Sequence, residues 1–309
     1  MTSSSDQCLA SIDRAYRGRL APTPTGLLHL GHARTFATAA RRSREAGGSL
    51  VMRIEDLDAP RCKPEFASAA LADLAWLGIA WHEGPDIGGP YGPYTQSLRN
   101  DIYLDLWRKL PRRRRDLSQS PFAARRAVRA RRPHEGDDES IFPPELRPAT
   151  ETTHDAVDPG PLNWRFRVPD GRTIRFHDER LGGLERTAGV DFGDFLIWRK
   201  DGFPSYEAAV VADDHAMRIT EVVRGEDLLT STARQLLLYE TLGWTPPRWY
   251  HCELVRDECG HRLAKRTAAL SIAELRTRGV APAEILTTSS ERLITDFTDK
   301  TDPHGREND

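Results

Sequence analysis

Two histidines three residues apart, His29 and His32, follow a turn rich in proline and glycine in the segment RLAPTPTGLLHLGHART. The apolar periodicity after the turn predicts a helix that begins at these residues. The N–H groups and the dipole of a helix start favour a phosphate, and residues three apart share one face of the first turn. Both histidines could therefore donate to phosphate oxygens, and Gly31 would let a flat base approach the backbone. The alternative is a capped helix with two surface histidines.

Arg19 and Glu55 stand where two predicted strands end, and they carry opposite charges. A guanidinium binds a carboxylate through two parallel hydrogen bonds, and a carboxylate binds an ammonium group. Free glutamate carries both kinds of group, so the two residues could recognise this amino acid. The alternative is that Arg19 and Glu55 form an ion pair with each other.

A basic segment, GHRLAKR, lies in a loop between the last predicted strand and a short helix. Its Lys265 could neutralise the charge that develops on a triphosphate during displacement. Arg262 supplies a second positive charge in the same loop. The alternative is a basic surface loop without a ligand.

These residues need a scaffold that brings the ends of several strands together. The first half is predicted from strands at 17–21 and 49–54 and helices at 29–46, 64–77 and 96–110. The second half is predicted from strands at 195–198, 206–211, 221–223 and 250–255 and a helix at 228–242. Strands that flank a crossover helix lie parallel, so we expect an α/β fold, a Rossmann-like doubly wound parallel sheet. Ligands bind such sheets at the carboxyl ends of the strands.

The distribution of charge divides the chain into five parts. Eleven Lys or Arg and one acid lie between residues 108 and 132, and strands at 164–168 and 173–177 follow, which indicates an inserted α+β module. The basic run could follow an RNA backbone, and the alternative is an ordinary solvated face. The predicted parts are a flexible N-terminus (1–15), the first catalytic half (16–110), the insert (111–190), the second catalytic half (191–286) and a polar tail (287–309).

The composition restricts the class of protein. A formal net charge of −2 over 309 residues gives no overall signature of nucleic-acid binding. The sequence has no run of about 18 apolar residues, and its start lacks the apolar region of a signal peptide. The four cysteines form no CxxC pair, which is typical of reduced thiols. We therefore expect a cytoplasmic monomer that makes no membrane contact.

The pattern RxAPxPTGxLHxGxAR resembles the HIGH signature of class I aminoacyl-tRNA synthetases, and specifically its glutamyl and glutaminyl form. The resemblance covers about residues 16–110 and 190–270. GHRLAKR is similar to the KMSKS loop of this family, with Arg262 for the first lysine and Ala264 for the serine. The resemblance implies that ATP binds as its Mg²⁺ complex at His29, Gly31, His32, Arg262 and Lys265. It gives the catalytic role to His29, His32 and Lys265.

The resemblance also implies a glutamate pocket. Tyr206 in GFPSYEAAVVADD and Arg224 in EVVRGEDLL match family positions that contact glutamate. On its own, Tyr206 reads as a core residue. The implied pocket residues are Arg19, Leu20, Ala21, Pro22, Thr23, Glu55, Tyr206 and Arg224.

The chain ends soon after the second signature, whereas glutamyl-tRNA synthetases continue into a helical domain that reads the anticodon. In this respect it resembles the glutamyl-Q tRNA(Asp) synthetases, and Val210 stands where glutamyl-tRNA synthetases usually have Asn. The resemblance implies tRNA-independent activation of L-glutamate with ATP and transfer to queuosine in the anticodon of tRNA(Asp). One alternative is a minimal glutamyl-tRNA synthetase that charges a tRNA 3′ end. Another is a catalytically inactive RNA-binding relative.

Many of these shortened enzymes hold zinc in the insert through Cys-x-Cys and Tyr-x₃-Cys. The matching positions here are Leu110, Arg112, Phe142 and Leu146, and none can ligate zinc. We therefore expect neither zinc nor another protein-bound metal, and we expect packing and charge to hold this corner of the insert.

Overall fold

The computed structural model describes residues 15–110, 117–119, 141–142, 147, 158–255 and 271–287. The arginines of the basic run after residue 110 lie outside these ranges, and so do Arg112 and Leu146 of the expected zinc-free corner. The GHRLAKR segment, with Arg262 and Lys265, also lies outside them. The predictions for these residues are therefore not tested by the fold.

The first β-α-β unit forms as the sequence predicts. Strand β1 (Arg17–Leu20) pairs in parallel with β2 (Ser49–Met52), and helix α1 (Leu30–Glu45) connects them. Phe36 of α1 packs in one apolar cluster with residues of both strands. Gly47 ends the helix with φ +60°, a left-handed conformation that favours glycine.

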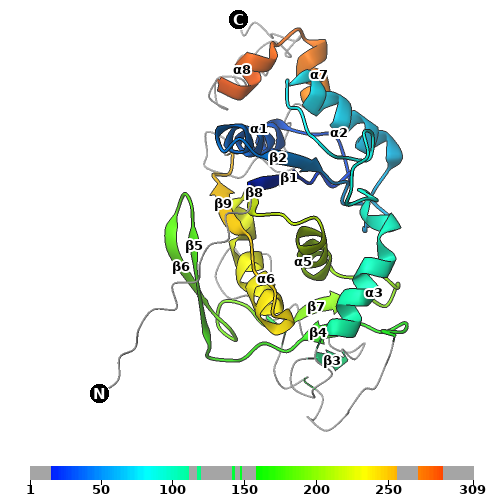
Figure 1. Cartoon of the computed structure of the whole chain (residues 1–309), viewed down its shortest axis with the longest axis vertical. Coiled ribbons are helices and arrows are strands. Elements are labelled where there is room, and N and C mark those ends of the chain that lie inside the picture. Colours follow the sequence, from blue (N-terminus) through cyan, green and yellow to red (C-terminus); the bar gives the residue numbers. More distant parts are fainter. Residues whose placement is uncertain are drawn as a thin grey trace, which may run out of the picture.

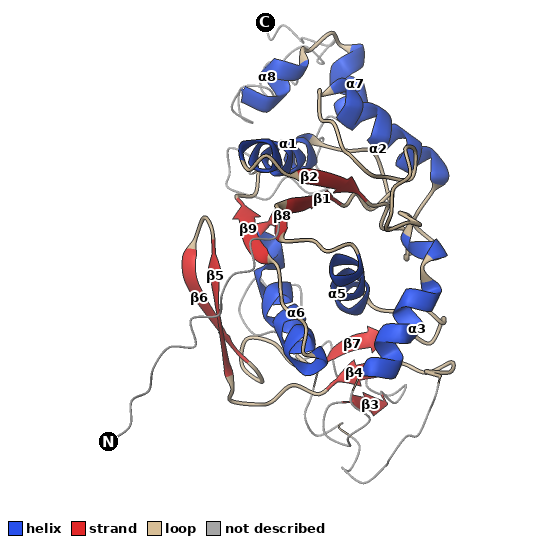
Figure 2. Ribbon diagram, viewed as in Figure 1, coloured by secondary structure: helices blue, strands red, loops and turns tan. Residues whose placement is uncertain are grey.

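The second half of the sheet lies beside the first. Strands β8 (Glu221–Gly225) and β9 (Arg248–Cys252) are parallel, and helix α6 (Leu229–Leu242) connects them. The N–H of Thr220 donates to the carbonyl oxygen of Arg17 over 2.8 Å, which joins β8 to β1. The order β2, β1, β8, β9 can be followed in Figure 1, and Figure 2 shows α1 on one side of these strands and α6 on the other. The predicted doubly wound architecture is confirmed.

One predicted element is wrong. Residues 206–211, expected as a strand, belong to helix α5 (Tyr206–Ala216). The Ser205 hydroxyl accepts the N–H of Ala208 and caps the helix start. Every residue from Glu207 to Asp214 is buried, so this part of the helix has no solvent-exposed face, and its sequence carries no amphipathic period. Periodicity alone cannot separate such a buried helix from a buried strand.

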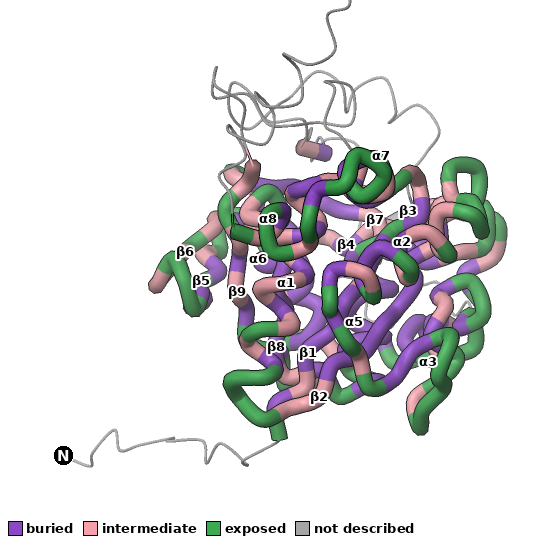
Figure 3. Tube along the Cα trace, turned by 90° about the horizontal axis from the view of Figure 1, so that it is seen from above, coloured by how far each residue is buried: buried purple, intermediate pink, exposed green. Residues whose placement is uncertain are grey.

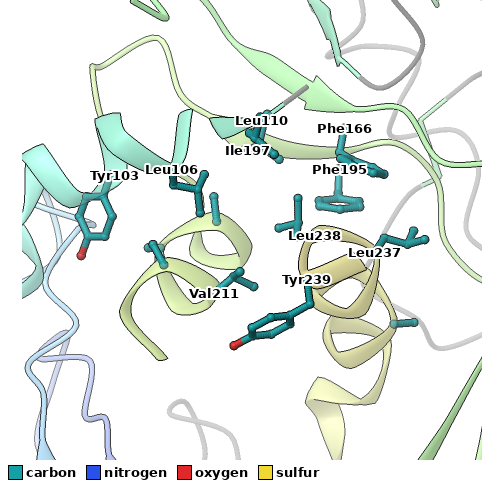
Figure 4. Close-up of a cluster of buried hydrophobic side chains, with 14 of the residues drawn as sticks. Tyr103, Leu106, Leu110, Phe166, Phe195, Ile197, Val211, Leu237, Leu238 and Tyr239 are labelled. Atoms are coloured by element: carbon teal, nitrogen blue, oxygen red, sulfur yellow. The ribbon is translucent and has the colours of Figure 1, made fainter. Parts of the chain in front are cut away.

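A second layer lies below the helices α5 and α6. Strand β4 (Trp164–Phe166) pairs in antiparallel fashion with β3 (Leu117–Gln119) and β7 (Phe195–Trp198). Apolar side chains of this sheet pack on helices α3, α5 and α6, as Figure 4 shows for Phe166, Phe195 and Leu238. This cluster holds α5 and α6 against the main sheet.

An antiparallel hairpin of β5 (Thr173–Asp178) and β6 (Gly182–Thr187) extends the main sheet at its edge. The last residue of β5, Asp178, pairs with Trp249 of β9. The end of the hairpin therefore lies next to the strand that follows α6. The limits of the five predicted parts of the chain stay a prediction.

The remaining elements cover the edges of the molecule. They are α2 (Pro64–Trp76), η1 (Gln96–Leu98), α3 (Asn100–Lys109), η3 (Glu226–Leu228), α7 (Ile272–Thr277) and α8 (Pro282–Thr287). Figure 3 shows that β1 and β8 are largely buried, whereas the β5–β6 hairpin and the outer faces of the peripheral helices are partly exposed. Among the described helices, none combines the length and the apolar character that a membrane span needs.

Candidate active site

A cavity of about 360 Å³ opens at the carboxyl ends of β1, β8 and β9. Most of the residues expected to bind ligand line this one space. They are Arg19, Ala21, Thr23, His29, Gly31, His32, Glu55, Tyr206 and Arg224. The two groups that the sequence separates, a helix start with histidines and a charged pocket, therefore lie in a single cavity.

At one end of the cavity the two histidines cap helix α1. The N–H of Gly31 donates to Nδ1 of His29 over 3.1 Å, and the N–H of His29 donates to Nδ1 of His32 over 3.3 Å. The two rings are stacked with their centroids 3.7 Å apart. Because an accepting Nδ1 carries no hydrogen, a neutral ring in this position carries its proton on Nε2. Nε2–H is then the ring donor suited to a phosphate oxygen.

Gly31 has a local reason to be glycine. A Cβ at this position would lie 3.1 Å from Cε1 and 3.2 Å from Nδ1 of the His29 ring. A side chain here would displace the ring that caps the helix. The expected close approach of a base to this residue stays a prediction.

At the other end, Arg19 and Glu55 do not pair with each other. The Arg19 guanidinium donates through Nη1 to the carbonyl oxygen of Val223 over 2.7 Å, and its buried Nε has no hydrogen-bond partner among the described residues. Glu55 instead accepts from Nη2 of Arg53 over 2.8 Å. The ion pair considered from the sequence is therefore absent between these two described residues. Burial lowers the pKa of Arg19 and raises the pKa of Glu55.

A buried ionic cluster holds Glu55 in place. Nη1 of Arg53, which is fully buried, donates to Asp214 of α5 over 2.7 Å. The neighbouring Asp213 accepts from Nε of Arg99 over 2.6 Å. Desolvation of charged groups has a large free-energy cost, so they are buried only where each charge has an opposite partner. The cluster fixes the carboxylate of Glu55 at the wall of the cavity.

Arg224 is buried, with 3% of its surface exposed, and its contacts are with uncharged groups. Its Nη2 donates to the Thr232 hydroxyl over 2.7 Å and its Nη1 to Oε1 of Gln235 over 3.0 Å. Its Nε lies 3.2 Å from Nε2 of His251. A looser contact of 3.5 Å joins Nη1 to the Tyr206 hydroxyl. A buried guanidinium with neutral partners is a strong site for a ligand carboxylate.

Leu20 and Pro22 differ from the other expected pocket residues, because they do not line the cavity. Leu20 is fully buried in the apolar core, and its carbonyl oxygen accepts the N–H of Arg53 over 2.8 Å. The carbonyl oxygen of Pro22 accepts the N–H of Glu55 over 3.0 Å. Both residues continue the pairing of the first two strands and so position Glu55.

Several residues of the cavity were not predicted. They are Thr35, Phe36, Val223, Gly225, Asp227, Leu228, Glu253, Leu254 and Val255. Asp227 lies in the segment that supplies Arg224, and Glu253 follows β9 directly. The rule that ligands bind beyond the ends of parallel strands could have found both.

The described residues on either side of the stretch 256–270, which contains GHRLAKR, lie at this cavity. Val255, the last described residue before it, lines the cavity. Ser271, the first described residue after it, forms a β-bridge with His29, and the N–H of Ile272 donates to the carbonyl oxygen of Leu28 over 2.8 Å. The chain between them therefore leaves from and returns to the end of the cavity that carries the histidines.

The corner of the insert where related enzymes hold zinc has apolar side chains at its two described positions. Leu110 and Phe142 are 2% and 1% exposed, and the Arg165 guanidinium lies 4.6 Å from the centre of the Phe142 ring. Nearby, Arg147 donates to both carboxylate oxygens of Asp194 over 2.8 and 2.7 Å. Leu110 and Phe142 do not fit a zinc site. In the described part of the chain, no three His, Cys, Asp or Glu side chains lie together as metal ligands do.

Comparisons with known proteins identify a matching family and several similar proteins. Residues 15–300 match the family described as tRNA synthetases class I (E and Q), catalytic domain. The chain is 44% identical over 277 residues to a glutamyl-Q tRNA(Asp) synthetase of Nitratidesulfovibrio vulgaris, with 87% of this chain and 83% of that protein covered. It is 42% identical over 273 residues to one of Symbiobacterium thermophilum, with coverages of 87% and 84%.

A solved structure of similar fold is the glutamate-tRNA synthetase of Elizabethkingia anophelis. It superposes with a TM-score of 0.71 at 32% identity, over 82% of this chain and 53% of that protein. The chain thus spans about half the length of that synthetase.

Proposed function

The chain belongs to the class I tRNA synthetases of the E and Q type, and on this basis we propose that it activates L-glutamate with ATP and transfers it to queuosine in the anticodon of tRNA(Asp). The observation that carries the proposal is the single cavity, which combines a helix start suited to phosphate with two buried guanidinium groups and one carboxylate. Two relatives similar over most of their length are named glutamyl-Q tRNA(Asp) synthetase.

The charges of the pocket suit glutamate. Arg19 and Arg224 have only uncharged hydrogen-bond partners among the described residues, so each can take one of the two carboxylates of the amino acid. Glu55 offers a carboxylate for the α-ammonium group. Tyr206, whose hydroxyl lies near Arg224, adds a polar contact. A neutral side-chain amide would leave one buried guanidinium uncompensated, which disfavours glutamine.

The other end of the cavity suits the triphosphate of ATP. His29 and His32 would donate to phosphate oxygens at the start of α1, beside Gly31. Arg262 and Lys265 would reach the same phosphates from the segment that begins at Val255 and ends at Ser271. Mg²⁺ would enter with ATP, held mainly by phosphate oxygens and water, as this ion prefers.

The reaction then has two steps and needs no enzyme nucleophile. An α-carboxylate oxygen of glutamate attacks the α-phosphorus of ATP, and pyrophosphate leaves. A hydroxyl on the cyclopentene ring of queuosine attacks the acyl carbon of the adenylate, loses its proton, and AMP leaves. His29, His32 and Lys265 would stabilise the charge that builds on the phosphates in the first step.

Three forms of tRNA(Asp) test the proposal. We would measure transfer of radiolabelled glutamate to tRNA(Asp) with queuosine, to the same tRNA without its 3′-terminal adenosine, and to intact tRNA(Asp) without queuosine. Transfer to the first two but not to the third is expected. Transfer to the first and third but not the second would mean 3′-end charging, the alternative activity of a minimal glutamyl-tRNA synthetase. No transfer to any form, together with no glutamate-dependent pyrophosphate exchange, would mean a catalytically inactive relative.

A further inference from the structure

Two buried titratable residues lie behind the pocket and have no part in the contacts proposed for glutamate or ATP. His251 of β9 and Asp178 of β5 are both 0% exposed. They come from strands more than 70 residues apart in sequence, paired where the β5–β6 hairpin joins the sheet. Buried ionisable groups are rare away from functional sites unless they hold structure together, so their contacts matter.

Asp178 fixes the proton of His251. Oδ2 of Asp178 lies 2.7 Å from Nδ1 of His251 and also accepts the backbone N–H of His251 over 3.0 Å. Oδ1 accepts the N–H groups of Arg180 and Leu181 over 3.0 and 2.9 Å. Burial opposes ionisation of Asp178, but these hydrogen bonds, led by that of His251, hold its pKa below the ordinary value. Because a carboxylate can only accept, Nδ1 carries the proton, and Nε2 is an acceptor.

That acceptor faces Arg224. Nε2 of His251 lies 3.2 Å from Nε of Arg224 and 3.1 Å from the Thr232 hydroxyl. Burial and the Arg224 charge lower the pKa of His251 to about 4, so the ring is neutral near pH 7. A bond to Nε fixes the plane of a guanidinium and therefore the direction of its two terminal nitrogens.

We propose that His251 and Asp178 are positioning residues that aim Arg224 at a carboxylate of glutamate. The chain of contacts runs from the hairpin, through the carboxylate and the imidazole, to the guanidinium at the wall of the cavity. This inference rests on the proposed function and adds two residues to it. It makes the affinity for glutamate, and its preference over glutamine, depend on residues that do not touch the amino acid.

Two amide substitutions at position 251 differ only in reach. Gln places its carbonyl oxygen near the position of Nε2 and can still accept from Arg224. Asn reaches only the position of Nδ1, so H251N keeps the contact with Asp178 and loses the one with Arg224. We expect H251N to raise KM for glutamate about 10- to 100-fold, because it loses a hydrogen bond to a charged group. KM for ATP should stay unchanged. H251Q should recover most of that loss.

A third variant, D178N, tests the proton directly. Its carbonyl oxygen would keep the contacts with Arg180 and Leu181, so its amide group would face His251, donate to Nδ1 and lose the hydrogen bond from the backbone N–H of His251. The ring proton would move to Nε2 and oppose the N–H of Arg224. We expect KM for glutamate to rise about tenfold. The control is H215Q, at an exposed histidine stacked on Trp244.

The readout is ATP–pyrophosphate exchange with varied glutamate, glutamine and ATP, together with thermal unfolding of each variant. If the wild-type protein shows no exchange with glutamate, the proposed function fails. If the wild type is active and both H251N and D178N keep its KM for glutamate, the positioning role fails. The proposal would also be overturned if H251Q and H251N raised KM for glutamate and KM for ATP equally and lowered thermal stability equally. That result would mean a purely structural role.

Discussion

The two ends of the cavity are built in different ways. At the end that we propose binds glutamate, the amino-acid end, Glu55 and Arg224 are almost completely buried, and both are held by side chains from other elements of the fold. At the end that we propose binds the triphosphate of ATP, the phosphate end, His29 and His32 are partly exposed and are held by backbone N–H groups of their own helix start. The remaining cations proposed for this end, Arg262 and Lys265, lie in the sequence between Val255, which lines the cavity, and Ser271, which forms a β-bridge with His29.

The difference follows from what each end must do. Recognition of a small charged amino acid requires charges that are desolvated and fixed before the ligand arrives, because reorganisation would weaken discrimination. Stabilisation of a pentacoordinate phosphorus requires donors and cations placed where negative charge develops in the transition state. Damage to the first end should therefore change binding and folding, and damage to the second should change the rate.

The largest expected effect comes from removal of Arg53 at the amino-acid end. R53L would leave Glu55 and Asp214 buried without their cation, which should lower the free energy of unfolding by about 3–5 kcal/mol. Chemical denaturation would measure it. The control R172L breaks an exposed ion pair with Glu240 and should cost less than about 1 kcal/mol. Similar losses for both variants would contradict the account of a prebuilt charged pocket.

At the phosphate end, K265A should lower kcat for pyrophosphate exchange about 10²- to 10³-fold, as expected for loss of one group that stabilises the transition state. KM for glutamate should stay within about twofold of the wild-type value. The control K63A removes an exposed lysine at the start of helix α2 and should leave both constants unchanged. A raised KM for glutamate with an unchanged kcat would contradict the assignment of substrate binding to one end and of rate to the other.

A pH series should sharpen the contrast at the amino-acid end. The pKa of His251 is about 4 in the folded protein and near the ordinary 6.5 in the unfolded chain. Between these values the unfolded chain binds the proton more readily than the folded protein. The contribution of neutral His251 to the free energy of unfolding is therefore fully present above pH 6.5 and is lost as the pH falls from 6.5 to 4. This residue should account for up to about 3 kcal/mol. Chemical denaturation of the wild type and of H251Q at several pH values would measure this contribution. If the free energies of unfolding of the two proteins changed in parallel with pH, the prediction would be contradicted.

The smallest expected effect is at the turn before α1. G31A would bring a Cβ within 3.1 Å of the His29 ring and displace it, which should lower kcat about threefold to tenfold. The control G26A lies in the same turn and meets nothing within 4 Å. Equal activity of both variants in pyrophosphate exchange would mean that the position of the His29 ring does not matter.

The sequence predicted the parts of the site that depend on local order. The helix start with His29 and His32, and the strand ends with Arg19 and Glu55, follow from patterns of a few residues. The supports of the pocket could not be predicted, because Arg53 meets Asp214 across 161 positions and His251 meets Asp178 across 73. Helix α5 was misread for a related reason, since burial on all sides removes the period that marks a helix.

Glutamate-dependent ATP–pyrophosphate exchange in the absence of tRNA tests the central claim most directly. Glutamate, glutamine, aspartate and asparagine would each be offered at equal concentration with ATP and Mg²⁺. We predict exchange with glutamate alone, because two buried guanidinium groups and one carboxylate match only its charges and length. Exchange that requires bound tRNA, or that runs faster with glutamine or aspartate, would contradict the account.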